Sequence, residues 1–201
     1  MAGAVGDRRN GVTDASPNPL EQPLVWIDLE MTGLDPERDR IVEVAVIVTD
    51  GALERLEEGP DLVLGAAEQS LKDMDPVVVK MHELSGLTEA VRASTMTVEE
   101  AEGYVLEFVT HHVPLARSAP LAGNSVHADR AFLRRYMPAL EAYVHYRNVD
   151  VSTIKELARR WYPAALEQAP RKTGGHRALA DIRESIDELR YWRGAIFKPV
   201  R

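Results

Sequence analysis

The sequence has no cysteine and no long apolar run, and its charge balance is not basic. Because none of its 201 residues is cysteine, the chain has no disulfide, no thiolate chemistry and no cysteine-ligated zinc. No apolar run approaches the roughly 18 residues of a membrane helix. The N-terminus has charges but no hydrophobic segment typical of a signal peptide. We therefore expect a cytoplasmic protein that does not bind to or cross a membrane.

The charge balance limits the ligands that the chain can hold. With 24 Lys and Arg against 32 Asp and Glu, the formal net charge is -8. A long nucleic-acid groove usually shows as a basic excess, so extended polyanion binding is not favoured. The acidity leaves room for a short phosphate ligand that is held through metal ions. The length and the 45% hydrophobic content suit one globular domain with a substantial core.

The pattern along the chain predicts an α/β domain. Residues 1–22 are rich in Gly, Ala, Asp, Asn and Pro without periodicity, which is typical of a disordered segment, and residues 23–201 form the domain. The predicted strands are 24–30, 41–49, 53–57, 61–64, 120–125 and 145–151. Helical patterns begin at about 76, and the clearest are 97–113, 128–137, 152–162 and 176–193. Strands first, followed by alternating strands and helices, indicate a mixed sheet.

Several element ends have their own signals. A Gly-Pro pair separates the predicted strands 53–57 and 61–64. Thr97 is followed by acids at positions 99 and 100, a pattern that is typical of a capping-box start. Ser152 is the predicted cap of helix 152–162, which ends at Pro163, and a polar loop is expected from there to Gly175.

The first predicted strand carries two acids among apolar residues. Side chains alternate across a strand, so Asp28 and Glu30 share one face with Leu24 and Trp26. Their Cα atoms would lie roughly 6.6 Å apart, from about 3.3 Å of rise per residue. Burial of unpaired charge is costly, and the strand has no Lys or Arg. The pattern fits either an edge strand with a solvated polar face or an oxygen-ligand site for a hard cation such as Mg2+ or Mn2+.

Further ligands for such a site occur at the starts of two later helices. Asp129 lies in the first turn of helix 128–137, where it is either a ligand or an acid favoured by the helix dipole. Asp181 is either a ligand or an exposed helix acid. His176 precedes Asp181 by five residues, which turn through about 500° on a regular helix. Both can therefore face one site only if His176 lies in the preceding loop or first turn, which Gly174 and Gly175 permit.

Three motifs in this order resemble a known family. They are DLEMTGLD (28–35), GNSVHAD (123–129) and HRALADIRES (176–185). With them, the long block YMPALEAYVHYRNVDVSTIKELARRWYP (136–163) is similar to the oligoribonuclease family, in the His-containing branch of the DEDD 3′-to-5′ exonucleases. The resemblance covers about residues 24–193.

The resemblance implies an RNase-H-like fold with a mixed five-stranded sheet flanked by helices. It also implies two divalent cations, Mg2+ or Mn2+, bound by a set of four acids: Asp28, Glu30, Asp129 and Asp181. His176 would be the general base that takes the proton from the attacking water. The family degrades very short RNA to mononucleotides, and it is typically a homodimer in which a residue matching Tyr146 reaches the partner's site.

Other matching positions are candidates for substrate binding. Ser125, Arg147 and Ser152 would hold a terminal phosphate; their alternatives are a loop hydroxyl, a surface cation and a helix cap. Leu34 would wedge against a base, or it is simple turn packing. His145 would join the dimer-site contact, or it is a half-exposed strand residue.

One position departs from the family pattern. Many members have a Trp where this sequence has Val77, so stacking worth roughly 1–3 kcal/mol per base is missing or supplied differently. We expect a metal-dependent 3′-to-5′ exoribonuclease that acts on short oligoribonucleotides, especially dinucleotides. The alternatives are a longer-substrate exonuclease of the same superfamily, used in proofreading or RNA trimming, and a non-catalytic binder of short nucleotides.

Overall fold

A five-stranded sheet lies at the centre of the computed structural model, which describes residues 20–171 and 175–198. The strands are β1 (Leu24–Met31), β2 (Ile41–Thr49), β3 (Leu56–Val63), β4 (Pro120–Gly123) and β5 (His145–Asp150). Their order across the sheet is β3-β2-β1-β4-β5. β1, β2 and β3 form an antiparallel meander, while β1, β4 and β5 are parallel. The mixed five-stranded sheet expected from the sequence is confirmed.

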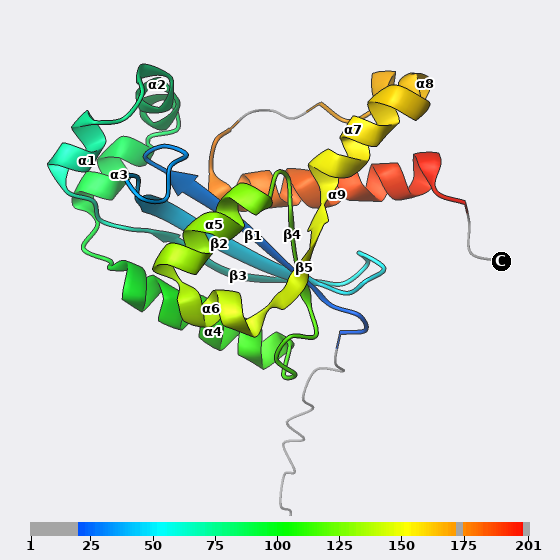
Figure 1. The fold of residues 1–201 in the computed structure, drawn as a ribbon, viewed down its shortest axis with the longest axis horizontal. Coiled ribbons are helices and arrows are strands. Elements are labelled where there is room, and N and C mark those ends of the chain that lie inside the picture. Colours follow the sequence, from blue (N-terminus) through cyan, green and yellow to red (C-terminus); the bar gives the residue numbers. More distant parts are fainter. Residues whose placement is uncertain (1–19, 172–174, 199–201) are drawn as a thin grey trace, which may run out of the picture.

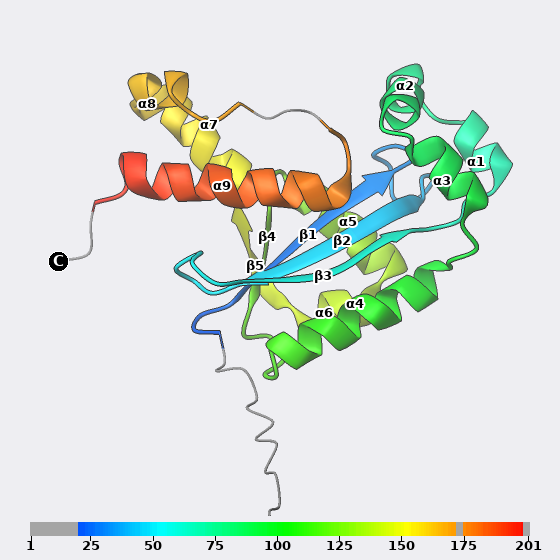
Figure 2. The same cartoon turned by 180° about the vertical axis from the view of Figure 1, so that it is seen from behind.

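Helices cover both faces of this sheet and one of its ends. They are α1 (Glu68–Lys72), α2 (Pro76–Leu84), α3 (Leu87–Ala93), α4 (Val98–His112), α5 (His127–Tyr136), α6 (Pro138–Tyr143), α7 (Val151–Trp161), α8 (Pro163–Glu167) and α9 (Ala178–Ile196). α4, α5 and α6 share a core with one face, and α7 and α9 share a core with the other. α1, α2 and α3 gather at the end toward which β1 points (Figure 1; Figure 2 gives the view from behind).

The side chains of β1 divide between the two cores as the alternation predicts. Val25, Ile27 and Leu29 pack with α4, α5 and α6, whereas Trp26 packs with α7 and α9. The next residues on the Trp26 face are Asp28 and Glu30, which therefore point toward α9. Because β1 lies between β2 and β4, the edge-strand interpretation of these acids is wrong.

The third and fourth predicted strands, 53–57 and 61–64, needed one correction. The Gly59-Pro60 pair does not separate two strands, because β3 runs through it with a register shift opposite Ala45 to Ile47. Proline is tolerated there because β3 is an edge strand. Glycine is required because a Cβ on Gly59 would lie 2.5 Å from the Phe108 ring of α4.

The helix ends confirm some predictions and correct others. Thr97 forms the predicted capping box with Glu100. Ser152 is not the cap of α7, because the Asp150 carboxylate accepts the hydrogen bond from the Ser152 backbone N–H instead. The predicted polar loop from Pro163 begins with a short helix, α8. Pro138 ends α5 as the first residue of the next helix, α6, because proline suits a first helical position.

The N-terminal prediction falls mostly outside the described residues. Of the segment 1–22, which we expect to be disordered, the structure describes residues 20–22, where Leu20 is buried against the core. Among the helices that the structure describes, none combines the length and the apolar character that a membrane crossing requires.

Candidate active site

Three of the predicted residues converge at the end of β1. One ligand atom each from Glu30, His176 and Asp181 lies within 4.8 Å of the others, an arrangement that can hold a metal ion. Glu30 is buried, and His176 and Asp181 are half-buried. Glu30 comes from β1, whereas His176 and Asp181 come from the start of α9 and the residues just before it, far along the chain. The packing of α9 against the sheet therefore creates this cluster.

The start of α9 explains how His176 and Asp181 reach one place. α9 begins at Ala178, and Asp181 lies in its first turn, so His176 precedes the helix. His176 has a left-handed backbone with φ of 47°. His176 therefore lies in the preceding loop, as the five-residue spacing required. Outside the helix, its side chain is free to face the same site as Asp181. The interpretation of Asp181 as a solvated helix acid does not fit its half-buried position.

Asp129 of α5 lies beside β1, outside the group formed by Glu30, His176 and Asp181. Its side chain is buried, and its Oδ1 accepts a hydrogen bond of 3.1 Å from the backbone N–H of Leu29, the residue between Asp28 and Glu30. Burial raises the pKa of Asp129 to about 7, and the nearby Glu30 charge contributes in the same direction. Asp28 lies half-buried on the Glu30 face of β1.

The chemistry of these residues fits a hard divalent cation. Carboxylate oxygens are the ligands such ions prefer, and two carboxylates and an imidazole already lie within reach of one ion. Asp129 is enclosed and faces another acid, so its ionised form needs nearby positive charge. A bound cation would supply that charge and would remove the repulsion among the acids.

His82 also contacts this cluster, although the sequence pattern did not single it out. It lies on α2, is 2% exposed, and its Nε2 is 3.3 Å from Oε2 of Glu30. The contact joins residues 52 positions apart. No spacing or motif relates the two positions, so only the packing of α2 over the end of β1 reveals it.

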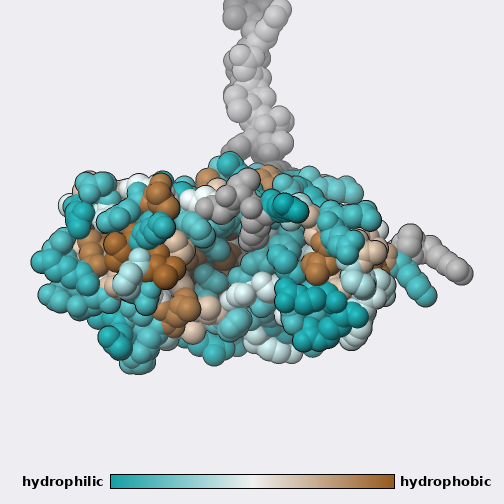
Figure 3. Space-filling view, turned by 90° about the horizontal axis from the view of Figure 1, so that it is seen from above, coloured by the Kyte–Doolittle hydropathy of each residue, from teal (hydrophilic) through white to brown (hydrophobic). Residues whose placement is uncertain are grey.

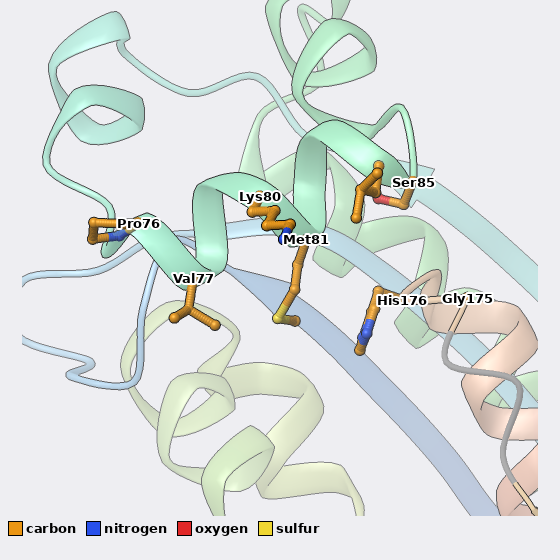
Figure 4. Close-up of a pocket in the computed structure, with 8 residues that line it drawn as sticks. Pro76, Val77, Lys80, Met81, Ser85, Gly175 and His176 are labelled. Atoms are coloured by element: carbon orange, nitrogen blue, oxygen red, sulfur yellow. The ribbon is translucent and has the colours of Figure 1, made fainter.

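A cavity of about 600 Å3 opens beside His176 and lies against α2. Figure 4 shows Val77 and Met81 pointing from α2 toward the space in front of His176, and Lys80 on the same helix. The other lining residues are Pro76, Leu84, Ser85 and Gly175. Among the described residues that line it, none is Phe, Tyr or Trp, so aliphatic and thioether groups form its apolar wall. Figure 3 shows hydrophobic side chains gathered at this end of the molecule.

The two predicted phosphate-binding serines lie next to each other. Ser125 follows β4 and Ser152 lies in the first turn of α7, and the Ser125 hydroxyl donates to that of Ser152 at 3.2 Å. The Asp150 carboxylate accepts from the backbone N–H groups of both serines, and the Ser152 hydroxyl donates to the Asn124 side chain. The hydroxyls therefore belong to one hydrogen-bonded unit at the ends of β4 and β5.

Of the remaining substrate-binding candidates, Leu34, Tyr146 and Arg147 are exposed and His145 is half-buried. On the edge strand β5, the ring centroids of His145 and Tyr146 are 4.4 Å apart, and the Arg147 guanidinium lies 5.5 Å from the Tyr146 ring centroid. Tyr146 is 72% exposed and Leu34, in the turn after β1, is 80% exposed. Neither Tyr146 nor Leu34 is among the residues that line the cavity beside His176.

Comparison with known proteins identifies the family. The exonuclease family model of the RNase T type matches residues 25–189. An oligoribonuclease of Rhodococcus jostii is 54% identical over 90% of this chain and 90% of its own length. One of Halorhodospira halophila is 58% identical over 86% of this chain and 93% of its own length. The chain belongs to the oligoribonuclease family. Human mitochondrial oligoribonuclease is 49% identical over 98% of this chain and 82% of its own length.

Solved structures give the wider relationship of this oligoribonuclease-family chain. Exonuclease I of E. coli, in complex with an oligonucleotide, matches with a TM-score of 0.66 at 17% identity, over 88% of this chain and 41% of that chain. Exonuclease I of Methylocaldum szegediense matches with a TM-score of 0.61 at 22% identity, over 87% of this chain and 41% of that chain. The chain thus spans about two fifths of these structures, and the likeness confirms the RNase-H-like fold.

Proposed function

We propose that this protein is a metal-dependent 3′-to-5′ exoribonuclease that degrades short oligoribonucleotides, especially dinucleotides, to mononucleotides. The observation that carries the proposal is the convergence of Glu30, His176 and Asp181 within 4.8 Å in a chain that belongs to the oligoribonuclease family. The cavity of about 600 Å3 beside His176 has room for a terminal nucleotide.

In this proposal the acids hold the metal. Asp28, Glu30, Asp129 and Asp181 bind two divalent cations, Mg2+ or Mn2+. When bound, such ions lower the pKa of water and stabilise the charge that develops on the phosphate oxygens. Asp129 is suited to this role because burial and its backbone hydrogen bond fix its carboxylate at the side of β1.

His176 acts as the general base. Its neutral imidazole accepts the proton from the water that attacks the phosphodiester, while the bond to the leaving 3′ oxygen breaks. The position supports this role because the half-buried imidazole lies between the acid cluster and the cavity, within reach of both. His82 contacts Glu30 and has no part in the reaction in this scheme.

The preference for short chains follows from a terminal phosphate site. Ser125, Ser152 and Arg147 bind the 5′ phosphate, and the adjacent serine hydroxyls support this assignment. A site that encloses a chain end rewards a dinucleotide and obstructs longer RNA. Leu34 and Val77 contact the bases, and without a ring at Val77 the apolar wall gives less stacking than an aromatic residue would.

The deciding experiment compares RNA lengths. We expect kcat/KM to be highest for a dinucleotide with a 5′ phosphate and to fall as nucleotides are added. Arg147→Ala should flatten this preference more than it slows longer RNA, whereas the control Arg159→Ala, an exposed arginine on α7, should leave it unchanged. A dinucleotide cleaved no faster than a 7-mer would favour the longer-substrate exonuclease, and metal-dependent binding without turnover would favour the non-catalytic binder.

The protein acts as a homodimer in this proposal, and Tyr146 reaches the partner's site. Tyr146 is supported in this role by its 72% exposure on an edge strand, and Trp161 on the adjacent α7 is also 65% exposed. A mixture of Tyr146→Ala and His176→Ala subunits should regain activity, because heterodimers hold one site with both residues intact. No recovery, with heterodimers shown to form, would place Tyr146 in its own subunit's site. The cytoplasmic location expected from the sequence is part of the same proposal.

A further inference from the structure

A second glutamate lies directly beside Glu30 but belongs to a different arrangement. Glu43 on β2 is the cross-strand partner of Glu30, so both side chains leave the same face of the sheet. Glu43 is completely buried. Two acids at directly opposed positions repel each other, so each needs its own source of positive charge. In the proposed function the bound cations would supply that charge for Glu30, and Glu43 needs another partner.

That partner is Arg177, the N-cap residue of α9. The Arg177 guanidinium donates to Oε1 of Glu43 through Nε at 2.8 Å and Nη2 at 2.6 Å. The other oxygen, Oε2, accepts the backbone N–H of Ala178 at 3.1 Å. Within the described residues, α9 receives no capping bond from the side chain of its own N-cap, Arg177. Glu43 therefore caps α9 from the sheet and fixes its N-cap residue, Arg177, and its first residue, Ala178.

In the sequence, this contact lies between His176 and Asp181. His176 immediately precedes Arg177, and the Arg177 carbonyl accepts the backbone N–H of Asp181 at 3.0 Å. Asp181 has further support, because Ile182 and Ile186 of the same helix are buried against the sheet. His176 has no helix to hold it and has a left-handed backbone. Its position depends much more on the residue that follows it.

We propose that the Glu43–Arg177 pair is a positioning device that holds the His176 imidazole at the acid cluster. The inference rests on the proposed function of His176 as general base. Glu43 and Arg177 touch neither substrate nor metal in this scheme. They set the angle at which the chain leaves His176 and enters α9, and Arg177 neutralises Glu43 so that it does not compete for the cations of its neighbour Glu30.

The chain offers a matched control on the same helix. Arg183 of α9 pairs with Glu58 of β3, so this contact also joins α9 to the sheet through an arginine and a glutamate. The Arg183–Glu58 pair is more exposed, with side-chain exposures of 55% and 38%, and it lies after Asp181. If any link between α9 and the sheet were sufficient, the two pairs would have similar effects on turnover.

The test compares Glu43→Gln with Glu58→Gln on a 5′-phosphorylated dinucleotide at saturating Mg2+. Residues that orient a functional side chain typically contribute about 10–100-fold, so Glu43→Gln should lower kcat by that factor with KM changed little. Glu58→Gln should match the wild type. Arg177→Lys is a second variant for the case that Glu43→Gln does not fold. It keeps a charge beside Glu43 but loses the two-nitrogen contact of the guanidinium, so kcat should fall by a similar factor.

Two further measurements separate positioning from general stability. In a His176→Ala background, Glu43→Gln should cost little more, because the group it positions is gone; an equal loss in both backgrounds would overturn the inference. Amide exchange at Ala178 should accelerate in Glu43→Gln and not in Glu58→Gln. Unchanged kcat in Glu43→Gln would also overturn it. If the wild type does not cleave the dinucleotide, the proposed function fails. The exchange measurement does not depend on turnover, so unchanged exchange at Ala178 in Glu43→Gln would still refute the contact between Glu43 and α9.

Discussion

Arg130 provides a test of how much a buried arginine stabilises β5, the edge strand that carries His145, Tyr146 and Arg147. Its side chain, on α5, is buried, and Nε donates to Oε1 of Glu141 at 3.0 Å. The same guanidinium donates to the Asn148 side chain at 2.6 Å and to the His145 and Arg147 carbonyls at 2.9 and 3.3 Å. One buried cation therefore holds β5 against α5.

The perturbation is Arg130→Met, which keeps most of the volume and removes every donor. Removing one member of a buried ion pair costs roughly 3–5 kcal/mol. Glu141 is only half-buried, and it retains a second partner because Arg134 Nε also donates to its Oε1, at 3.1 Å. We therefore expect the lower end, about 3 kcal/mol. Arg134→Met is the matched control: it removes a bond to the same oxygen from a side chain that is 67% exposed, which is worth below about 1 kcal/mol.

The assay is equilibrium urea unfolding at one fixed protein concentration. With a slope of about 1–3 kcal/mol per molar urea, Arg130→Met should lower the midpoint by roughly 1–3 M, with an unchanged slope. Equal losses in Arg130→Met and Arg134→Met would refute the argument from burial.

The pH dependence gives a second check on the same pair. Burial acts to raise the pKa of Glu141, but the hydrogen bonds from Arg130 and Arg134 outweigh it, so the pKa lies below its usual 4.5. A depressed pKa contributes stability above the unfolded value and loses it as the pH falls through the folded one. The difference between wild type and Arg130→Met should therefore narrow below about pH 4.

Other predictions concern the site and one helix. Asp28→Asn should abolish dinucleotide turnover at ordinary Mg2+ concentration with an unchanged circular dichroism spectrum, and full activity would sink the ligand assignment. His176→Ala should lower kcat by about 10²–10⁴ with metal binding retained, and an unchanged kcat would contradict the role. Thr97→Ala should cost about 1 kcal/mol of unfolding free energy because it breaks the capping box with Glu100, and an unchanged urea midpoint would show that the cap contributes nothing.

The sequence by itself determined the features that depend on local periodicity. The alternation along β1 correctly separated Val25, Ile27 and Leu29 from Trp26, and hence the faces of Asp28 and Glu30. A side chain's face is set by the two-residue repeat of a strand, which needs no knowledge of distant contacts. The resemblance in three short motifs was likewise enough for the fold and the family.

Tertiary structure decided the features that depend on which segments meet. The contact of His82 with Glu30 joins residues 52 positions apart, and that of Arg177 with Glu43 joins residues 134 positions apart. The continuity of β3 through Gly59 depends on its edge position and on the close approach of Phe108. No local pattern encodes such pairs, because a hydrogen bond between distant residues exists only after the sheet and helices have packed and brought donor and acceptor together.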